Sequence, residues 1–330
     1  MERLSWLRPF QRLTESGKHA LLYAAADGTF QSVGEDFGRS GQNVKVHLRR
    51  HVDVTIGKDH PQSKPAFLGI DEISLAKGKG SYRLVVYDLT VPWRPQLIRM
   101  HTSRKKEDVI ALLQEFASPE RIIGIAIDMW EPYKLAIETA LPHVYVVIDA
   151  FHLIQASTKA LDGVRKTVQT KLNKEQSLAM KQEKELFAKP IEDLTEQERE
   201  RLKAWEEAIP ELAKAISLHQ KLRALYRCRD FEEGLTLLAD WERDVLAADL
   251  EPFHRLLKTV WNWLPEIMNR FVCKISNAKT EGKNNQLRAM NKQGFGYSIP
   301  SLKARMEMKE QQTALNRWRK HQDRIENKTG

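Results

Sequence analysis

The chain has 330 residues, 42% of them hydrophobic, so it is long enough to bury a sizeable core in about two or three domains. Its formal net charge of +9 makes nucleic acid the first class of partner to consider. Cys228 and Cys273 stand alone, so we expect neither a disulfide framework nor a structural zinc site. No apolar run reaches the roughly 18–20 residues of a membrane span, so we expect a soluble cytoplasmic protein.

Residues 16–52 are predicted to form three short helices. Ser16 can cap a helix through 20–26, a second helix is expected over 29–37, and a third over 42–50. The spacing suits a helix-turn-helix, because Gly34 is small where two helices cross, Gly38 allows the turn and Val44 faces inward. The third helix then presents side chains that can contact adenine edges or phosphates: Gln42, Asn43, Lys45 and Arg49. A helical hairpin with a solvated basic face explains this stretch equally well.

After a polar, proline-containing linker at 53–65, strands and helices alternate. Apolar runs predict strands, and a 3.6-residue period predicts helices. In order they are strands at 67–74, 82–89 and 97–101, a helix at 105–116, a strand at 122–128, a helix at 131–141 and a strand at 144–149. This strand and helix order is that of the ribonuclease H-like fold, an α/β fold with a mixed sheet. In that fold the first and fourth strands each supply a carboxylate at adjacent points of the sheet.

Three of the predicted strands run into a carboxylate, at Asp71, Asp128 and Asp149. A carboxylate that closes a buried strand is unfavourable unless it is paired or binds a metal. The three together therefore predict an acidic, cation-binding edge of the sheet. Capping of the following helix explains any one of them taken alone.

The stretch from 151 to about 270 is nearly all helix by pattern, with dense charges that indicate solvated helix faces and a capping box at Thr195 and Glu198. Glu281 then stands among amides and bases at the start of another helix, which ends in the glycine-containing segment 293–297. We expect a DNA-binding region and linker at 1–60, a catalytic core at 66–152 and 273–298, an all-helical insertion at 153–272, and a basic helical tail at 299–330.

Two aspartates from strands and a glutamate from a later helix suit a pair of Mg²⁺ or Mn²⁺ ions, because these cations prefer carboxylate oxygens. Two such ions can hold the attacking and leaving oxygens of a phosphoryl displacement. Asp71 would bridge both ions, Asp128 would bind one and Glu281 the other. Lys283 and Arg288 are placed to hold phosphates beside Glu281, although solvation at the surface explains each of them equally well.

Five short motifs in this order resemble the ISL-three family of bacterial insertion-sequence transposases. They are Gly69-Ile-Asp-Glu72, Asp128-Met-Trp130 with Tyr133, Asp149-Ala-Phe-His152, Ala160-Leu-Asp162 with Arg165, and Thr280-Glu-Gly-Lys-Asn-Asn285. The resemblance covers about 67–298. It implies a DDE transposase of ribonuclease H-like fold, with a large helical insertion before the glutamate. Such an enzyme binds the terminal repeats of its element and catalyses metal-dependent strand cleavage and strand transfer.

Carried over by motif, the catalytic triad is Asp71, Asp128 and Glu281. The resemblance also implies double-stranded DNA as partner, both as element ends and as target, a homo-oligomer on that DNA, and a place at the bacterial nucleoid. Strand order favours Asp128 over Asp149 as the second acid, since the fourth strand lies beside the first. Asp149 remains the alternative. Asp149 and His152 match a motif that has a supporting role in related transposases.

The chain departs from the family pattern at its front. The resemblance implies a longer chain with a cysteine-rich, zinc-binding segment before the helix-turn-helix. No such cysteines occur in this sequence. Two other functions therefore stay open. One is a shortened, transposase-derived protein that binds DNA without cleaving it, and the other is a structure-specific nuclease on the same fold.

Overall fold

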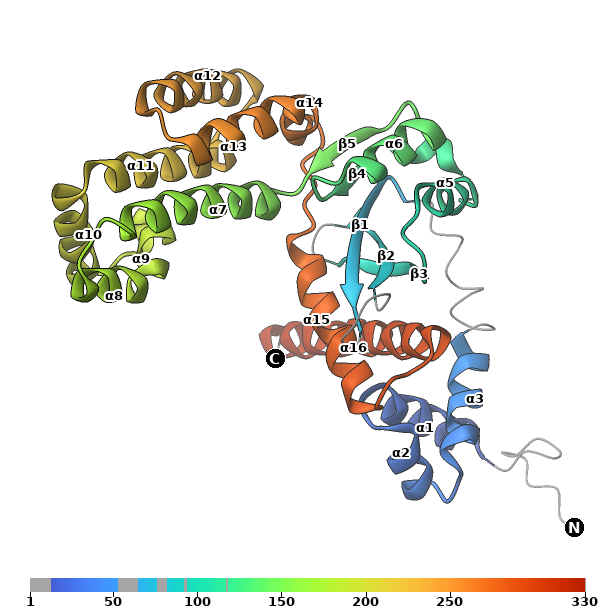
Figure 1. Ribbon diagram of the computed structural model, residues 1–330. Coiled ribbons are helices and arrows are strands. Elements are labelled where there is room, and N and C mark those ends of the chain that lie inside the picture. The colour runs from blue at the N-terminus through green and yellow to red at the C-terminus, as the bar shows by residue number, and fades with distance from the viewer. Residues whose placement is uncertain (1–12, 53–64, 76–81, 92–93, 117, 330) are drawn as a thin grey trace, which may run out of the picture. The chain divides into compact units, whose positions relative to one another are not determined.

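The structure is a computed structural model that describes residues 13–52, 65–75, 82–91, 94–116 and 118–329 (Figure 1). The chain divides into two compact units. The first contains 1–125, 135–144 and 279–330, and the second contains 126–134 and 145–278. No helix in the described residues combines the length and the apolar character needed to cross a membrane.

The first unit begins with three helices, α1 (Glu15–Asp27), α2 (Phe30–Asp36) and α3 (Gly41–His51), close to the predicted bounds. The expected cap at Ser16 is wrong. Thr14 caps α1 instead, because its hydroxyl accepts the Gly17 N–H at 2.9 Å. A Cβ at Gly34 would lie 2.5 Å from the carbonyl oxygen of Arg39, so α2 and the turn into α3 can approach this closely only with glycine.

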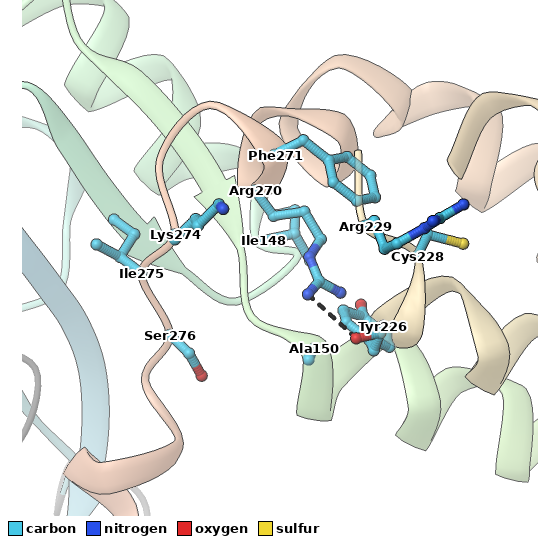
Figure 2. Close-up of a pocket in the computed structure, with 10 residues that line it drawn as sticks. All are labelled: Ile148, Ala150, Tyr226, Cys228, Arg229, Arg270, Phe271, Lys274, Ile275 and Ser276. Carbon is cyan, nitrogen blue, oxygen red and sulfur yellow. Dashed lines mark hydrogen bonds between the residues drawn. The ribbon is translucent and has the colours of Figure 1, made fainter. Parts of the chain in front are cut away.

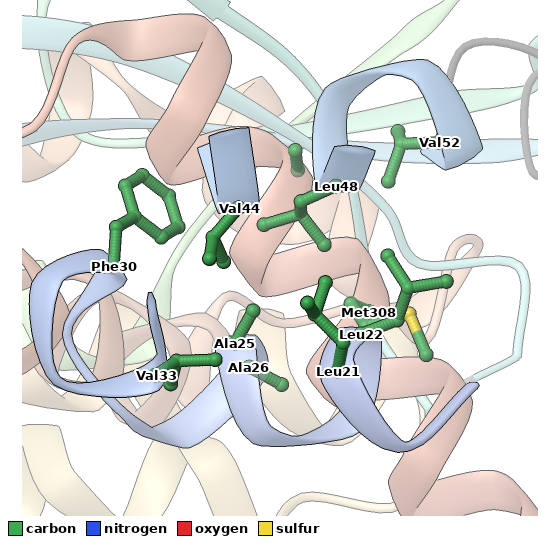
Figure 3. Packing of buried hydrophobic residues seen from close by; sticks show 11 residues of the cluster. Leu21, Leu22, Ala25, Ala26, Phe30, Val33, Val44, Leu48, Val52 and Met308 are labelled. Carbon is green, nitrogen blue, oxygen red and sulfur yellow. The ribbon is translucent and has the colours of Figure 1, made fainter. Parts of the chain in front are cut away.

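The core of these helices includes part of the C-terminal helix, α16 (Ile299–Thr329). Figure 3 shows the cluster, to which α1, α2 and α3 contribute most of the side chains and α16 contributes Ala304 and Met308. Arg305 of α16 is fully buried, and its guanidinium donates to the carbonyl oxygens of Ala25 (3.1 Å), Ala26 (3.3 Å) and Gly28 (2.9 Å). These bonds satisfy carbonyls at the C-terminal end of α1, which has no intrahelical donors for them.

The strands form one sheet in the order β3-β2-β1-β4-β5. Their bounds are β1 (Phe67–Ser74), β2 (Tyr82–Asp88), β3 (Gln96–His101), β4 (Gly124–Ile127) and β5 (Tyr145–Ile148). β1 pairs antiparallel with β2, and β2 pairs antiparallel with β3, with a register shift between Val86 and Tyr87. Helices α5 (Lys106–Gln114) and α6 (Glu131–Ala140) separate the last strands, so the predicted order of strands and helices is confirmed.

The second unit is mostly helical after β5, as expected from the sequence. Its helices are α7 (Ala150–Gln169), α8 (Lys174–Gln182), α9 (Lys184–Ala188), α10 (Glu196–Ala208), α11 (Pro210–Ala224), α12 (Phe231–Ala248), α13 (Glu251–Asn262) and α14 (Leu264–Met268). α11 packs against both α7 and α12 (Figure 1). The buried Trp241 donates its indole N–H to the carbonyl of Leu218 at 2.9 Å. The predicted capping box at Thr195 and Glu198 opens α10.

The chain then returns to the first unit through α15 (Ala278–Gln293). This helix ends where predicted, because the next residues take a left-handed backbone, with φ of 54° at Phe295 and 104° at Gly296. Glycine adopts the φ of position 296 without strain, because it has no Cβ. The turn directs the chain into α16.

Candidate active site

Asp71 lies within β1 and not at its end, because the ladder to β2 continues as far as Ser74. Its Oδ2 accepts a hydrogen bond of 2.6 Å from the Asn284 side-chain amide of α15. The Asn284 Oδ1 in turn accepts one of 2.7 Å from the hydroxyl of Tyr87 on β2. Both Tyr87 and Asn284 are buried, and burial raises the pKa of the Tyr87 hydroxyl, so this hydroxyl stays a donor. One buried amide thus holds the Asp71 carboxylate against the sheet.

The other residues predicted on α15 have different surroundings. Glu281 is exposed in the first turn of the helix. Lys283 forms an ion pair of 2.7 Å with Glu310 of α16, and burial raises the pKa of that glutamate. Arg288 is exposed and donates to Asn285 at 2.7 Å. Of the two predicted phosphate contacts, therefore, only Arg288 lacks an acidic partner among the ion pairs of the described residues.

The remaining acids belong to the second unit, at the ends of β4 and β5. Asp128 follows β4, and its Oδ1 lies 2.5 Å from Nε2 of His152 in the first turn of α7. Asp149 follows β5 and accepts a 3.1 Å hydrogen bond from the Ser276 hydroxyl. Asp149 is only 4% exposed, whereas the Asp128 side chain is 28% exposed. Burial raises the pKa of Asp149, which makes it the poorer candidate for a carboxylate that meets a solvent-borne cation.

Carboxylates are the donor type that fits Mg²⁺ or Mn²⁺. Among the residues that the structure describes, however, no group of three or more His, Cys, Asp or Glu side chains is placed to hold a metal ion. Asp71 and Glu281 belong to the first unit, and Asp128, Asp149 and His152 to the second. The donor chemistry therefore fits a hard cation, although the described residues form no assembled cage of such donors.

The predicted DNA-reading side chains are on α3. Gln42 and Arg49 are exposed, while Asn43 and Lys45 are partly exposed. The apolar face of the same helix, with Val44 and Leu48, is buried in the cluster of Figure 3. The polar face of α3 therefore lies opposite its packing face.

A family model described as Transposase, that of the DDE transposases of the ISL-three (ISL3) family, matches residues 68–306. This chain belongs to that family. It is also similar to the transposase for insertion sequence element IS1001 of Bordetella parapertussis, with 23% identity over 302 residues that cover 90% of this chain and 73% of that protein. Among solved structures, the Drosophila P element transposase strand transfer complex matches with a TM-score of 0.48 and 12% identity, over 91% of this chain and 92% of that one.

The ISL-three family predicted from the five motifs is thus confirmed. The matched region contains Asp71, Asp128, Asp149 and Glu281, whereas helices α1 to α3 precede it. Sequence reasoning missed Tyr87 and Asn284 as a unit that holds Asp71. The signals were weak but present, since Asn284 stands in the glutamate motif and Tyr87 interrupts an apolar run with a hydroxyl.

Proposed function

We propose that this chain is a DNA transposase that binds double-stranded DNA at the ends of its insertion element and cleaves and joins strands there, in a recombination reaction. One observation carries the proposal: the family match runs from 68 to 306 and includes the three carboxylates of the proposed triad. Asp71 is in β1, Asp128 follows β4 and Glu281 is in α15. The sheet order supports a ribonuclease H-like core, because β1 neighbours β4.

In this proposal Asp71, Asp128 and Glu281 bind two divalent ions, Mg²⁺ or Mn²⁺, which when bound would activate the attacking oxygen and stabilise the leaving one. Asn284 keeps the Asp71 carboxylate in one orientation through its 2.6 Å hydrogen bond. His152 does the same for Asp128 across 2.5 Å. Asp149 supports the site by fixing the start of α7 through Ser276. The acids and their holding groups together act as a catalytic core formed by 66–152 and 273–298.

DNA binding is assigned to helices α1 to α3 as a helix-turn-helix within 1–60. Its third helix presents Gln42, Asn43, Lys45 and Arg49 to base edges and phosphates. Arg288, and Lys283 once released from Glu310, add phosphate contacts on α15. The two remaining regions of this proposal are the helical insertion at 153–272 and the basic helical tail at 299–330. A transposase that joins two element ends acts as a homo-oligomer on DNA.

The test is cleavage of a labelled duplex of the element's terminal repeat with Mg²⁺ or Mn²⁺, and with EDTA. Asp71→Asn and Asp128→Asn should abolish cleavage while leaving DNA binding intact. Glu72→Gln is the matched control, because Glu72 is the next residue in β1, points to the other face of the sheet and pairs with Arg104 at 2.7 Å.

Each outcome of this experiment has a defined meaning. Retained cleavage by Asp71→Asn refutes the triad, and cleavage that is lost in Asp149→Asn but kept in Asp128→Asn reassigns the second acid. DNA binding without any cleavage by the parent protein would indicate a binding protein. Cleavage of branched DNA regardless of terminal sequence would indicate a structure-specific nuclease.

A further inference from the structure

A pocket of about 420 Å³ lies within the second unit, at the end of β5. Its walls come from the β5–α7 junction, from the turn at 226–229, and from the segment 270–276 that leads out of the helical insertion (Figure 2). No aspartate or glutamate is among the described residues that line it, whereas Arg229, Arg270 and Lys274 are. Arg229 pairs with Glu233 at 3.2 Å. The positive charge of the pocket that has no ion pair among the described residues therefore comes from Arg270 and Lys274.

Arg270 is the most informative of these residues. Its guanidinium lies 4.4 Å from the centroid of the Tyr226 ring and 5.3 Å from that of Phe271. Nη2 donates a long hydrogen bond of 3.4 Å to the Tyr226 carbonyl, and the buried Nη1 has no hydrogen-bond partner in the described part of the chain. Burial lowers the pKa of Arg270, and no ion pair to a carboxylate offsets that burial among the described residues. A partly buried cation without an ion pair among the described residues favours an anionic partner.

Tyr226 also contributes a polar group to this region, its side-chain hydroxyl. Its hydroxyl is buried and has no hydrogen-bond partner within the described residues. Apolar side chains, Ile148 and Ile275, also line the pocket. Cations, a hydroxyl donor and apolar walls together suit a group that is anionic at one end and flat and apolar at the other. The volume lies in the range of pockets for small organic ligands, about 300–1,000 Å³, and so exceeds the need of a bare phosphate ion.

We propose that this pocket binds one unpaired nucleotide of the DNA strand, with its phosphate on Arg270 and Lys274 and its base between the apolar walls. The inference rests on the proposed function, because that function supplies the DNA. The nucleotide must be unpaired, since a base cannot enter a pocket while it is stacked in a duplex. Ala150 and Ser276 also line the pocket; Ala150 follows Asp149 in the chain, and Ser276 donates the hydrogen bond to the Asp149 carboxylate. The bound strand therefore passes beside the turn that carries Asp149.

The test measures binding of the full chain to a fluorescent terminal-repeat duplex with an unpaired tail, by anisotropy in EDTA so that no cleavage occurs. Arg270→Met removes the charge but keeps a long apolar side chain. We expect an affinity loss of about 10–100-fold, from a lost charge-assisted contact, and a salt dependence reduced by about one counterion. Lys274→Met should lose about 3–10-fold. Arg243→Met is the charge-matched control, because Arg243 is an exposed residue of α12 outside the pocket, and its affinity should stay within about twofold.

A second measurement uses the parent protein, so it does not depend on whether the Arg270→Met variant folds normally. Cys228 lines the pocket, whereas the other cysteine, Cys273, is buried. The tailed duplex should slow alkylation of Cys228, and a blunt duplex of the same sequence should not. Tyr226→Phe, which keeps the ring and removes only the hydroxyl, should weaken binding of the tailed duplex and leave that of the blunt duplex unchanged.

Equal affinity of Arg270→Met and the parent for the tailed duplex would overturn the inference. Protection of Cys228 by a free mononucleotide or inorganic phosphate, with no protection by the tailed duplex, would also overturn it, because the occupant would then be a free anion. The binding assay tests the pocket and the cleavage assay tests the proposed catalysis, so failure of one can be told from failure of the other. Tail binding that depends on Arg270 in a protein that cleaves nothing would support the pocket and refute the proposed catalysis.

Discussion

The contact between Asn284 and Asp71 yields the sharpest prediction, because one buried amide serves two partners. Asn284→Leu keeps a branched side chain of similar size but removes the 2.6 Å bond to Asp71 and the 2.7 Å bond from Tyr87. A hydrogen bond to a charged group contributes about 1.5–3 kcal/mol to stability, and leaving a buried hydroxyl without its acceptor lowers stability by about 1–3 kcal/mol. Since these contributions are not additive, we expect the free energy of unfolding to fall by about 2–4 kcal/mol.

The same substitution should reduce cleavage, because Oδ2 of Asp71 loses the Asn284 donor, which orients the carboxylate together with the Glu72 N–H on Oδ1. Loss of a group that orients a metal ligand lowers activity or metal affinity by about 10–100-fold. We therefore expect Asn284→Leu to raise the Mg²⁺ concentration at half-maximal cleavage, measured under single-turnover conditions. Tyr87→Phe is the matched control. It removes only the outer bond, so it should lower the free energy of unfolding by about 1 kcal/mol and leave the metal dependence close to that of the parent.

Asn284→Asp separates a positioning role from simple packing. It places a second carboxyl group at the position of an amide that lies 2.6 Å from Asp71, so one of the two must hold a proton to keep the hydrogen bond. The pKa of the pair is then raised in the folded state. The variant is stabilised below that pKa and should lose stability and activity as the pH rises through it, as measured by urea unfolding at several pH values. An Asn284→Leu protein that unfolds and cleaves like the parent would refute the whole account.

Three further predictions concern stability. Arg305→Met should lower the free energy of unfolding by about 3–5 kcal/mol in urea titrations, because the carbonyls at the end of α1 lose their buried donor. A urea midpoint equal to that of the parent would contradict this role of Arg305. Gly34→Ala should destabilise by about 1–3 kcal/mol, since its Cβ would lie 2.5 Å from a backbone oxygen, whereas Gly282→Ala, with open space around its Cβ, should not destabilise. Burial lowers the pKa of His219 to about 4, so the unfolded state binds more protons at mildly acidic pH. Stability should thus fall by about 2 kcal/mol from about pH 7.5 to about pH 5, and His219→Gln should flatten this dependence in the same titrations.

Local signals in the sequence predicted most of the elements. The apolar runs before Asp71, Asp128 and Asp149 marked three strands, the Thr195 box marked the start of a helix, and the glycines at 34 and 38 marked a tight helical turn. Each signal acts within a few residues, because strand alternation, helix capping and left-handed turns are properties of neighbouring residues along the chain. The family motifs added the three acids of the proposed triad.

Only the tertiary structure decided which groups the polar side chains contact. Asn284 meets Asp71 across 213 positions of sequence, and Arg305 meets Ala25 across 280. Nor does the sequence distinguish the buried Asp149 from the more exposed Asp128, since both end an apolar run. The partner of a buried polar group is set by which distant segments close around it, and that closure depends on the packing of the whole unit. A periodic pattern places a residue on a face of its own helix or strand and contains no information about what that face meets.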